Sequence, residues 1–133
     1  MPGPARAGAV IYAKDALGLS SFYCQVLQAQ KLHSEPEYVV LESPDIQLVI
    51  HAIPAHIAST FEIASPPEPR EEAAIKLFFT VPSIDWARGE VARFGGVVHG
   101  QVWQGPGFSA CNAMDPEGNV FQVREIVSAA CPK

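Results

Sequence analysis

Asp115–Pro116–Glu117–Gly118–Asn119, followed by Val120–Phe121–Gln122–Val123, is the stretch that decides the fold. The aspartate can cap a turn, the proline fixes φ at the next corner, and Gly118 can adopt the positive φ that a tight turn needs. The residues after the turn favour a strand that continues to Ile126. The stretch therefore predicts a β-hairpin close to the C-terminus.

The chain before this hairpin predicts one strand, one helix and further strands. The run Ile75–Val81 is rich in β-forming residues, and Ser83 can cap the helix that follows it. The apolar face of that helix recurs every three or four residues, at Ile84, Ala87, Val91 and Phe94. Gly95–Gly96 predicts the end of the helix. The remaining strands are expected at 97–103, 108–114 and 119–126.

The first half of the chain shows the same order of elements. Gly8–Ala13 predicts a strand, and Asp15 stands at the start of a predicted helix, where a carboxylate caps free amides. The apolar face of this helix is formed by Leu19, Phe22, Tyr23, Val26 and Leu27. Three more strands are expected, at 31–34, 38–41 and 46–51.

The two halves can be aligned as a repeat. A shift of 68 residues places Ala13 on Val81 and Asp15 on Ser83, whereas a shift of 75 places Gln47 on Gln122. This indicates a duplicated β-α-β-β-β unit. We expect a single domain over residues 1–133, with module one at about 8–53, a proline-rich linker at about 54–74 and module two at about 75–126.

Composition excludes several classes of protein. The chain has 133 residues, of which 48% are hydrophobic and 17% charged, so a packed globule is expected. Its net charge of -5 and its lack of a basic cluster argue against binding to nucleic acid or to an anionic membrane surface. No apolar run approaches the ~18 residues of a membrane span, and no signal peptide is recognisable, so a cytoplasmic protein is expected.

The three cysteines do not form a pattern. Cys24, Cys111 and Cys131 are odd in number and widely spaced, and no CxxC pair exists. We therefore expect free thiols, and neither a disulfide framework nor a structural zinc site.

The motifs together resemble the vicinal oxygen chelate superfamily, which includes glyoxalase I, extradiol dioxygenases and the fosfomycin- and bleomycin-resistance proteins. The resemblance is carried by residues 115–123, by Phe22–Tyr23 followed by Val26–Leu27, and by the strand, helix and Gly-Gly pair from Val81 to Gly96. It covers about residues 8 to 126. It implies an α+β fold in which two tandem βαβββ modules form a cupped mixed sheet.

The resemblance also implies where a metal would be held. The corresponding positions here are Gly8, Gln47, Lys76 and Gln122. Glycine has no side chain, and a protonated lysine has no lone pair and repels a cation. Divalent ions prefer carboxylate or imidazole ligands to two neutral amides. We therefore expect no metal and no cofactor.

A cup of this kind would be an apolar pocket with a few polar groups. Strand alternation places Gln47 and His51 on one face and Gln122 with Arg124 on another. The side chains expected to bind a ligand are Tyr12, Gln47, His51, Lys76, Phe78, Trp103, Phe108, Gln122 and Arg124. Three alternatives stay open: Gln47 pairs with Gln122, Lys76 extends into solvent, and Trp103 only packs. The sequence identifies no catalytic residue.

We expect a protein that binds a small aromatic or anionic molecule in a metal-free cup, as in the bleomycin-resistance group, and that forms a homodimer. A second interpretation is a divalent-metal-dependent enzyme of the glyoxalase or dioxygenase type. A third is a noncatalytic dimeric interaction module. The sequence leaves open whether the chain is an enzyme.

Overall fold

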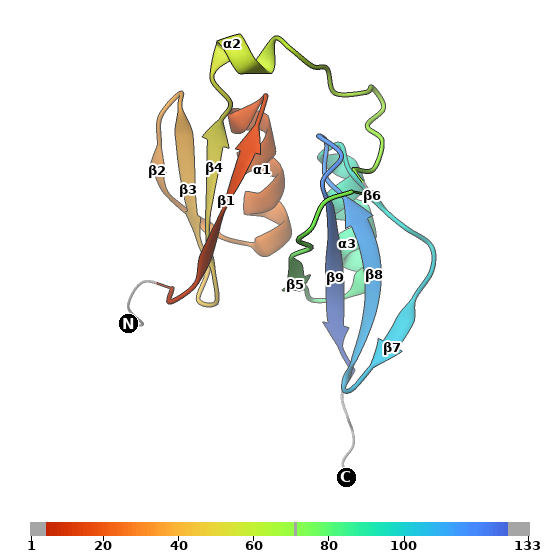
Figure 1. Ribbon diagram of the computed structural model, residues 1–133. Coiled ribbons are helices and arrows are strands. Elements are labelled where there is room, and N and C mark those ends of the chain that lie inside the picture. Colours follow the sequence, from red (N-terminus) through yellow and green to blue (C-terminus); the bar gives the residue numbers. More distant parts are fainter. Residues whose placement is uncertain (1–4, 71, 128–133) are drawn as a thin grey trace. The chain divides into compact units, whose positions relative to one another are not determined.

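The computed structural model describes residues 5–70 and 72–127, and the chain divides into two units, Met1–Ile63 and Ala64–Lys133 (Figure 1). In each unit a helix lies on one side of a mixed sheet. The α+β class and the two sheets agree with the sequence prediction. That both modules belong to one domain stays a prediction. In the described part of the chain, no helix is long and apolar enough to cross a membrane.

The first unit has the strand order β1-β4-β3-β2, in which β1 runs parallel to β4 and the other neighbours are antiparallel. Its elements are β1 (Gly8–Ala13), α1 (Ala16–Leu27), β2 (Gln30–Ser34), β3 (Tyr38–Glu42) and β4 (Gln47–Ala52). A short helix, α2 (Ala55–Ala58), begins the linker.

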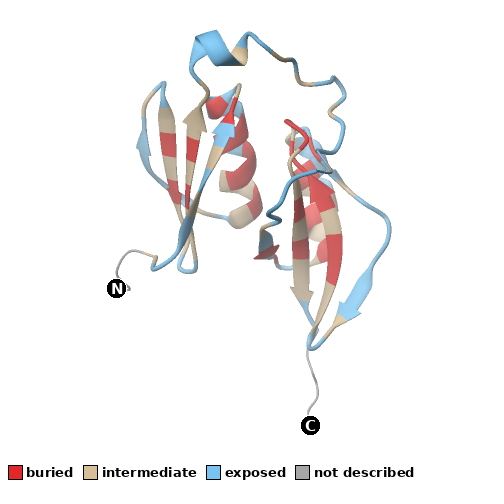
Figure 2. Cartoon of the chain, viewed as in Figure 1, coloured by how far each residue is buried: buried red, intermediate tan, exposed pale blue. Residues whose placement is uncertain are grey.

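Helix α1 forms where its cap and its apolar face predict it. The Asp15 side chain accepts a hydrogen bond from the backbone N–H of Gly18, and Gln28 ends the helix in the left-handed conformation at φ 50°. The helix contacts β3 and β4. The buried core of this unit includes Leu19, Phe22, Tyr23, Val26, Val39, Leu41, Leu48 and Ile50 (Figure 2).

The second unit has the strand order β5-β9-β8-β6, with β7 also paired to β8. Its elements are β5 (Phe78–Thr80), α3 (Ile84–Arg93), β6 (Val97–Val98), β7 (Trp103–Gly105), β8 (Phe108–Met114) and β9 (Val120–Ile126). Strand β5 is parallel to β9, and β8 and β9 form the antiparallel hairpin. Both helices of the βαβββ pattern thus occur after the first strand of their unit.

The caps of α3 match the sequence prediction. Ser83 Oγ accepts a hydrogen bond from the Trp86 N–H, which is the same three-residue reach as that of Asp15 in the first unit. At the other end Gly95 has φ 96°, and the Gly96 N–H donates to the Val91 carbonyl. These bonds satisfy backbone groups that a helix end leaves open.

Two predicted strands differ from the structure. The stretch 97–103 is not one strand, because only Val97–Val98 and Trp103–Gly105 pair with β8. Where the first of these segments ends, Arg88 of α3 donates to the carbonyls of Val98 and His99, at 3.3 and 2.9 Å. The predicted strand 75–81 shortens to β5, Phe78–Thr80.

The β8–β9 turn is built as predicted. Asp115 is fully buried, and its Oδ1 accepts from the N–H groups of Glu117 and Asn119. Gly118 has φ 88°. Its carbonyl accepts a hydrogen bond from the Arg70 N–H, at 2.8 Å, so the linker lies against this turn.

The strand registers correct the predicted repeat. Tyr12 lies opposite His51, and Thr80 lies opposite Arg124. The offset is therefore 68 at the first strand and 73 at the last, not 75. The counterpart of Gln122 in the first unit is Val49, and Gln47 corresponds to Val120.

Candidate functional site

The candidate site is the side of the second sheet that faces away from α3, called here the open face. Helix α3 contacts β9 and β6, and its Arg88 reaches the buried Cys111 Sγ at 3.5 Å. Since successive side chains of a strand alternate, Asn112 lies on the opposite side from Cys111. Gln122 lies directly opposite Asn112 on β9 and shares that side.

The two amides at the centre of the open face are both bound to cations. Lys76 Nζ donates to Asn112 Oδ1 at 3.2 Å, and Arg124 Nε donates to Gln122 Oε1 at 2.7 Å. Neither an ammonium nor a guanidinium can accept a hydrogen bond, so each amide turns its oxygen to the cation. The NH₂ groups of both amides have no partner in residues 5–70 and 72–127. At the centre of this face the two NH₂ groups and the two cations are therefore donors, and each amide oxygen already has one of its two lone pairs bound to a cation.

Two aromatic rings hold the Arg124 side chain. The guanidinium carbon lies 3.6 Å from the ring centroid of Phe78 and 4.2 Å from that of Phe108. These are cation–π contacts, which orient the guanidinium. Phe78 nevertheless stays 51% exposed, so a ligand can still reach it. Trp103 lies opposite Ala110, which in turn lies opposite Arg124, so its side chain belongs to the same face.

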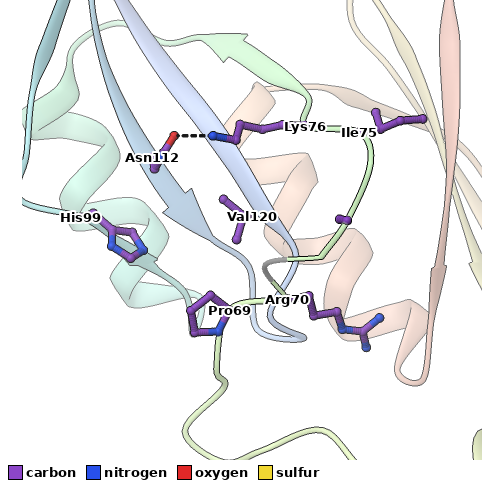
Figure 3. A pocket seen from close by; sticks show the side chains of 8 residues that line it. Pro69, Arg70, Ile75, Lys76, His99, Asn112 and Val120 are labelled. Atoms are coloured by element: carbon purple, nitrogen blue, oxygen red, sulfur yellow. Dashed lines mark hydrogen bonds between the residues drawn. The ribbon is translucent and has the colours of Figure 1, made fainter.

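A pocket of about 300 Å³ adjoins the Lys76–Asn112 pair (Figure 3). Figure 3 shows Lys76 meeting Asn112, while the guanidinium of Arg70 points away from them. The backbone carbonyl of Asn112 accepts a hydrogen bond from the His99 N–H at 2.8 Å, so Asn112 positions both Lys76 and His99. None of the residues that line this pocket is acidic; they are Pro69, Arg70, Ala73, Ile75, Lys76, His99, Asn112 and Val120.

The first unit places three predicted residues, Tyr12, Gln47 and His51, on the face of its own sheet that lies away from α1. The His51 ring lies 5.5 Å from the Tyr12 ring and 6.1 Å from the Tyr38 ring. Gln47 Nε2 donates to Glu42 Oε1 at 2.8 Å. This hydrogen bond, and then that of the Ala5 N–H, lower the pKa of Glu42 from its ordinary value.

The structure thus brings together most of the predicted residues of the second module. On the open face, Lys76 donates to Asn112 and Arg124 donates to Gln122. The rings of Phe78 and Phe108 form cation–π contacts with the arginine. Gln47 and Gln122 each bond within their own unit, and Lys76 bonds to Asn112.

Sequence reasoning missed four residues of these two faces: Tyr38, Glu42, His99 and Asn112. For Asn112 a signal existed, because it is a single amide among the mainly apolar residues of the predicted strand 108–114. Alternation along the predicted strand from Tyr38 could have placed Tyr38 and Glu42 on one face. The His99 backbone is bound by two residues distant in sequence, since its N–H donates to the Asn112 carbonyl and its carbonyl accepts from Arg88, so no local signal places it.

The four positions implied for a metal do not fit one. A Cβ on Gly8 would lie 2.7 Å from the Gln47 carbonyl oxygen, so β1 has no room for a ligand there. Lys76 is a cation, and the Gln122 oxygen is bound to Arg124. Within residues 5–70 and 72–127, no group of three or more His, Cys, Asp or Glu side chains could hold an ion. Cys24 and Cys111 are free thiols, and Cys131 lies outside the described residues.

Comparison with known proteins gives a consistent result for the fold. No family model and no curated protein matches the sequence. Among solved structures, a glyoxalase/bleomycin resistance protein/dioxygenase family enzyme from Burkholderia phytofirmans PsJN matches with a TM-score of 0.69 and 19% identity, over 92% of this chain and 98% of that one. A glyoxalase/bleomycin resistance protein from Albidiferax ferrireducens T118 matches with a TM-score of 0.63 and 14% identity, over 90% and 96%.

A glyoxalase-related enzyme from Fulvimarina pelagi matches with a TM-score of 0.61 and 14% identity, over 90% of this chain and 86% of that one. At these identities the likeness concerns the fold. The chain therefore has the glyoxalase/bleomycin resistance protein/dioxygenase fold, consistent with the resemblance to the vicinal oxygen chelate superfamily.

Proposed function

We propose that the chain binds a small anionic molecule with an aromatic part on the open face of the second unit, and that it does so without a metal ion. One observation carries this proposal. The oxygens of Asn112 and Gln122 are each bound to a cation, so two cations and two amide NH₂ groups present donors side by side on this face. A ligand that pairs with these donors must supply acceptors, and anionic oxygens are the strongest acceptors.

The surroundings of these donors support the same class of ligand. Phe78 and Phe108 give apolar area beside the Arg124 guanidinium, so an aromatic acid could place its ring near the rings and its carboxylate near the nitrogens. A hydrogen bond to a charged group contributes about 1.5–3 kcal/mol. The strand residues of this face include no acidic side chain in the described part, so nothing there repels an anion.

The experiment is isothermal titration calorimetry on protein treated with EDTA and then dialysed free of it. The probes are benzoate, salicylate and phenylacetate, with benzamide as the neutral comparison for benzoate. We expect at least one acid to bind and benzamide to bind about tenfold more weakly or not at all. Arg124→Gln should weaken binding of the acid about tenfold or more. Arg93→Gln, which removes an exposed arginine from α3, should leave the affinity within about twofold.

Two outcomes would contradict the proposal. One is benzamide binding as tightly as benzoate, since the charge would then play no part. The other is that none of the acids binds after EDTA treatment but one binds when Mn²⁺, Ni²⁺, Zn²⁺ or Fe²⁺ is added, which would favour a metal-dependent enzyme. Circular dichroism of Arg124→Gln verifies that the variant is folded.

The resemblance implies a homodimer, and we include this state in the proposal. Exposed apolar side chains on the sheet faces, such as Val10 at 53% and Ile126 at 65%, leave area for a second copy to cover. Size-exclusion chromatography with light scattering should give a mass near twice 14.3 kDa. A monomer at every concentration would rule the dimer out and leave the ligand proposal intact.

A further inference from the structure

The two cations of the open face lie on opposite sides of the Asn112–Gln122 pair. Strand β5 runs parallel to β9 with Phe78 opposite Gln122. Lys76 lies two residues before Phe78, and Arg124 lies two residues after Gln122. At a rise of about 3.3 Å per residue, their backbone positions are separated by roughly 13 Å along the strands. Both side chains lean inward, since each bonds to one member of the central amide pair.

Each cation belongs to a separate group of donors. At one end Lys76 and the Asn112 NH₂ border the 300 Å³ pocket, and the ring of His99 lies in the wall of the same pocket. At the other end the Arg124 guanidinium and the Gln122 NH₂ lie beside Phe78 and Phe108. Neither end contains a carboxylate among the described residues that form it. Glu72 lines a neighbouring hollow together with Pro69 and Asn119, not this pocket.

From this arrangement we infer that the ligand carries two anionic groups, one for each end, joined by a flat apolar body. This inference rests on the proposed function and names its ligand class, a small dianion. A ligand with one acid group would fill one set of donors and leave the second cation without a counter-charge. The pocket has the volume of a small ligand site, so it has room for an acid group with the adjoining part of the body. Phe78, opposite Gln122 at the centre of the face, supplies apolar surface for that body, and Val120 supplies it in the pocket wall.

Calorimetry with matched diacids and monoesters tests the inference. The probes are terephthalate and biphenyl-4,4′-dicarboxylate, each compared with its own monomethyl ester, which keeps the ring system and removes one charge. We expect at least one diacid to bind about tenfold or more tightly than its monoester, and the gain to shrink at high salt because it is electrostatic. Two diacids of different length are used because both cationic side chains lean inward, so the separation of the charged groups is shorter than that of the backbone positions.

Variants show which residues are responsible for the tighter binding of the diacid. Lys76→Met should weaken the diacid about tenfold or more and weaken the monoester less, so that the advantage of the diacid over the monoester disappears. Asn112→Asp keeps a partner for Lys76 but places a carboxylate at that end, and it should also abolish the advantage. Arg124→Gln should weaken diacid and monoester alike. Lys31→Met, which removes an exposed lysine from β2 of the first unit, is the matched control and should change neither affinity by more than about twofold.

The outcomes separate this inference from the proposed function. If the monoesters bind and neither diacid binds more tightly, the two-anion arrangement is wrong and the proposed function stands. The arrangement is also wrong if Lys76→Met weakens the monoester as much as the diacid. If no acid of either series binds, the proposed function itself fails.

Discussion

Asn112 and Gln122 lie directly opposite each other on β8 and β9, and each turns its side-chain oxygen to a different cation. In the first unit Gln47 does the reverse, because its amide nitrogen donates to the Glu42 carboxylate. The direction of an amide is therefore decided by the charge next to it. The same residue type leaves donors on one sheet and an acceptor on the other.

Reversing the charge at Gln122 tests this account. In Gln122→Glu the new carboxylate would pair with Arg124 and place a negative charge where the ligand's acid is expected. We predict that the affinity for benzoate, or for whichever monoacid binds, falls about tenfold or more in calorimetry, while stability changes by less than about 1 kcal/mol. Gln104→Glu adds the same charge to exposed β7, where the Gln104 side chain accepts a hydrogen bond from Ser109 Oγ, and should be without effect. Equal losses in both variants would show that only net charge matters.

Gly118→Ala should destabilise the second unit more than Gly107→Ala does. Both glycines have positive φ, 88° and 80°, so both variants carry the backbone strain of an L-residue there, about 1–2 kcal/mol. Only at Gly118 would the added Cβ overlap the Glu68 carbonyl of the linker, whereas Gly107 has open space. Urea unfolding measures the difference, which we expect to be at least about 1 kcal/mol. Equal free energies of unfolding for the two variants would mean that the linker moves away from the new Cβ without loss of stability.

Asp115→Ala should lower the free energy of unfolding by about 3 kcal/mol, because it leaves buried N–H groups without an acceptor. The lost bonds come from the backbone of Glu117 and Asn119, at 2.8 and 3.0 Å, and from Asn119 Nδ2. Asp115→Asn keeps one oxygen for the backbone groups and should cost less than half as much. Urea denaturation with an unchanged m-value is the measurement. A loss in the asparagine variant as large as that in the alanine variant would assign the effect to charge rather than to the turn.

Stability should depend on pH through Glu42. Its pKa is lowered in the folded chain, chiefly by the hydrogen bond from Gln47, so the folded state favours the carboxylate. The stabilisation is therefore present above the pKa of the unfolded chain and is lost as the pH falls through the folded value. Glu42→Gln removes this contribution. The difference in free energy of unfolding between wild type and Glu42→Gln should be constant near pH 7 and shrink below the ordinary glutamate range. A difference that grows in acid would have the wrong sign.

Local signals account for most of the fold. Asp15 and Ser83 predict the helix starts because each bonds to a backbone group three residues away, and Gly118 predicts the turn because its φ is a local property. The strand predicted at 97–103 is interrupted between Val98 and Trp103, where Arg88, eleven residues before His99, donates to the His99 carbonyl. No pattern within a strand contains that information.

The site was predictable in part. Alternation placed Gln122 and Arg124 on one face, and the structure has their side chains bonded to each other. The predicted repeat offset at the last strand was wrong because register depends on pairing between strands, which puts Val49 rather than Gln47 in the position of Gln122. The direction of each amide could not be predicted, because Asn112 receives Lys76 from 36 residues away.

Gly8 has a consequence for how this protein could change. Gly8 has no side chain, and the neighbouring strand lies so close that the Cβ of any other residue would clash with the Gln47 carbonyl oxygen. A single codon change there cannot install an imidazole or a carboxylate without forcing β1 and β4 apart. A related protein with a metal ligand at this position would need a wider spacing between β1 and β4. The spacing of the strands, and not only the chemistry of the side chains, therefore disfavours a metal ligand here.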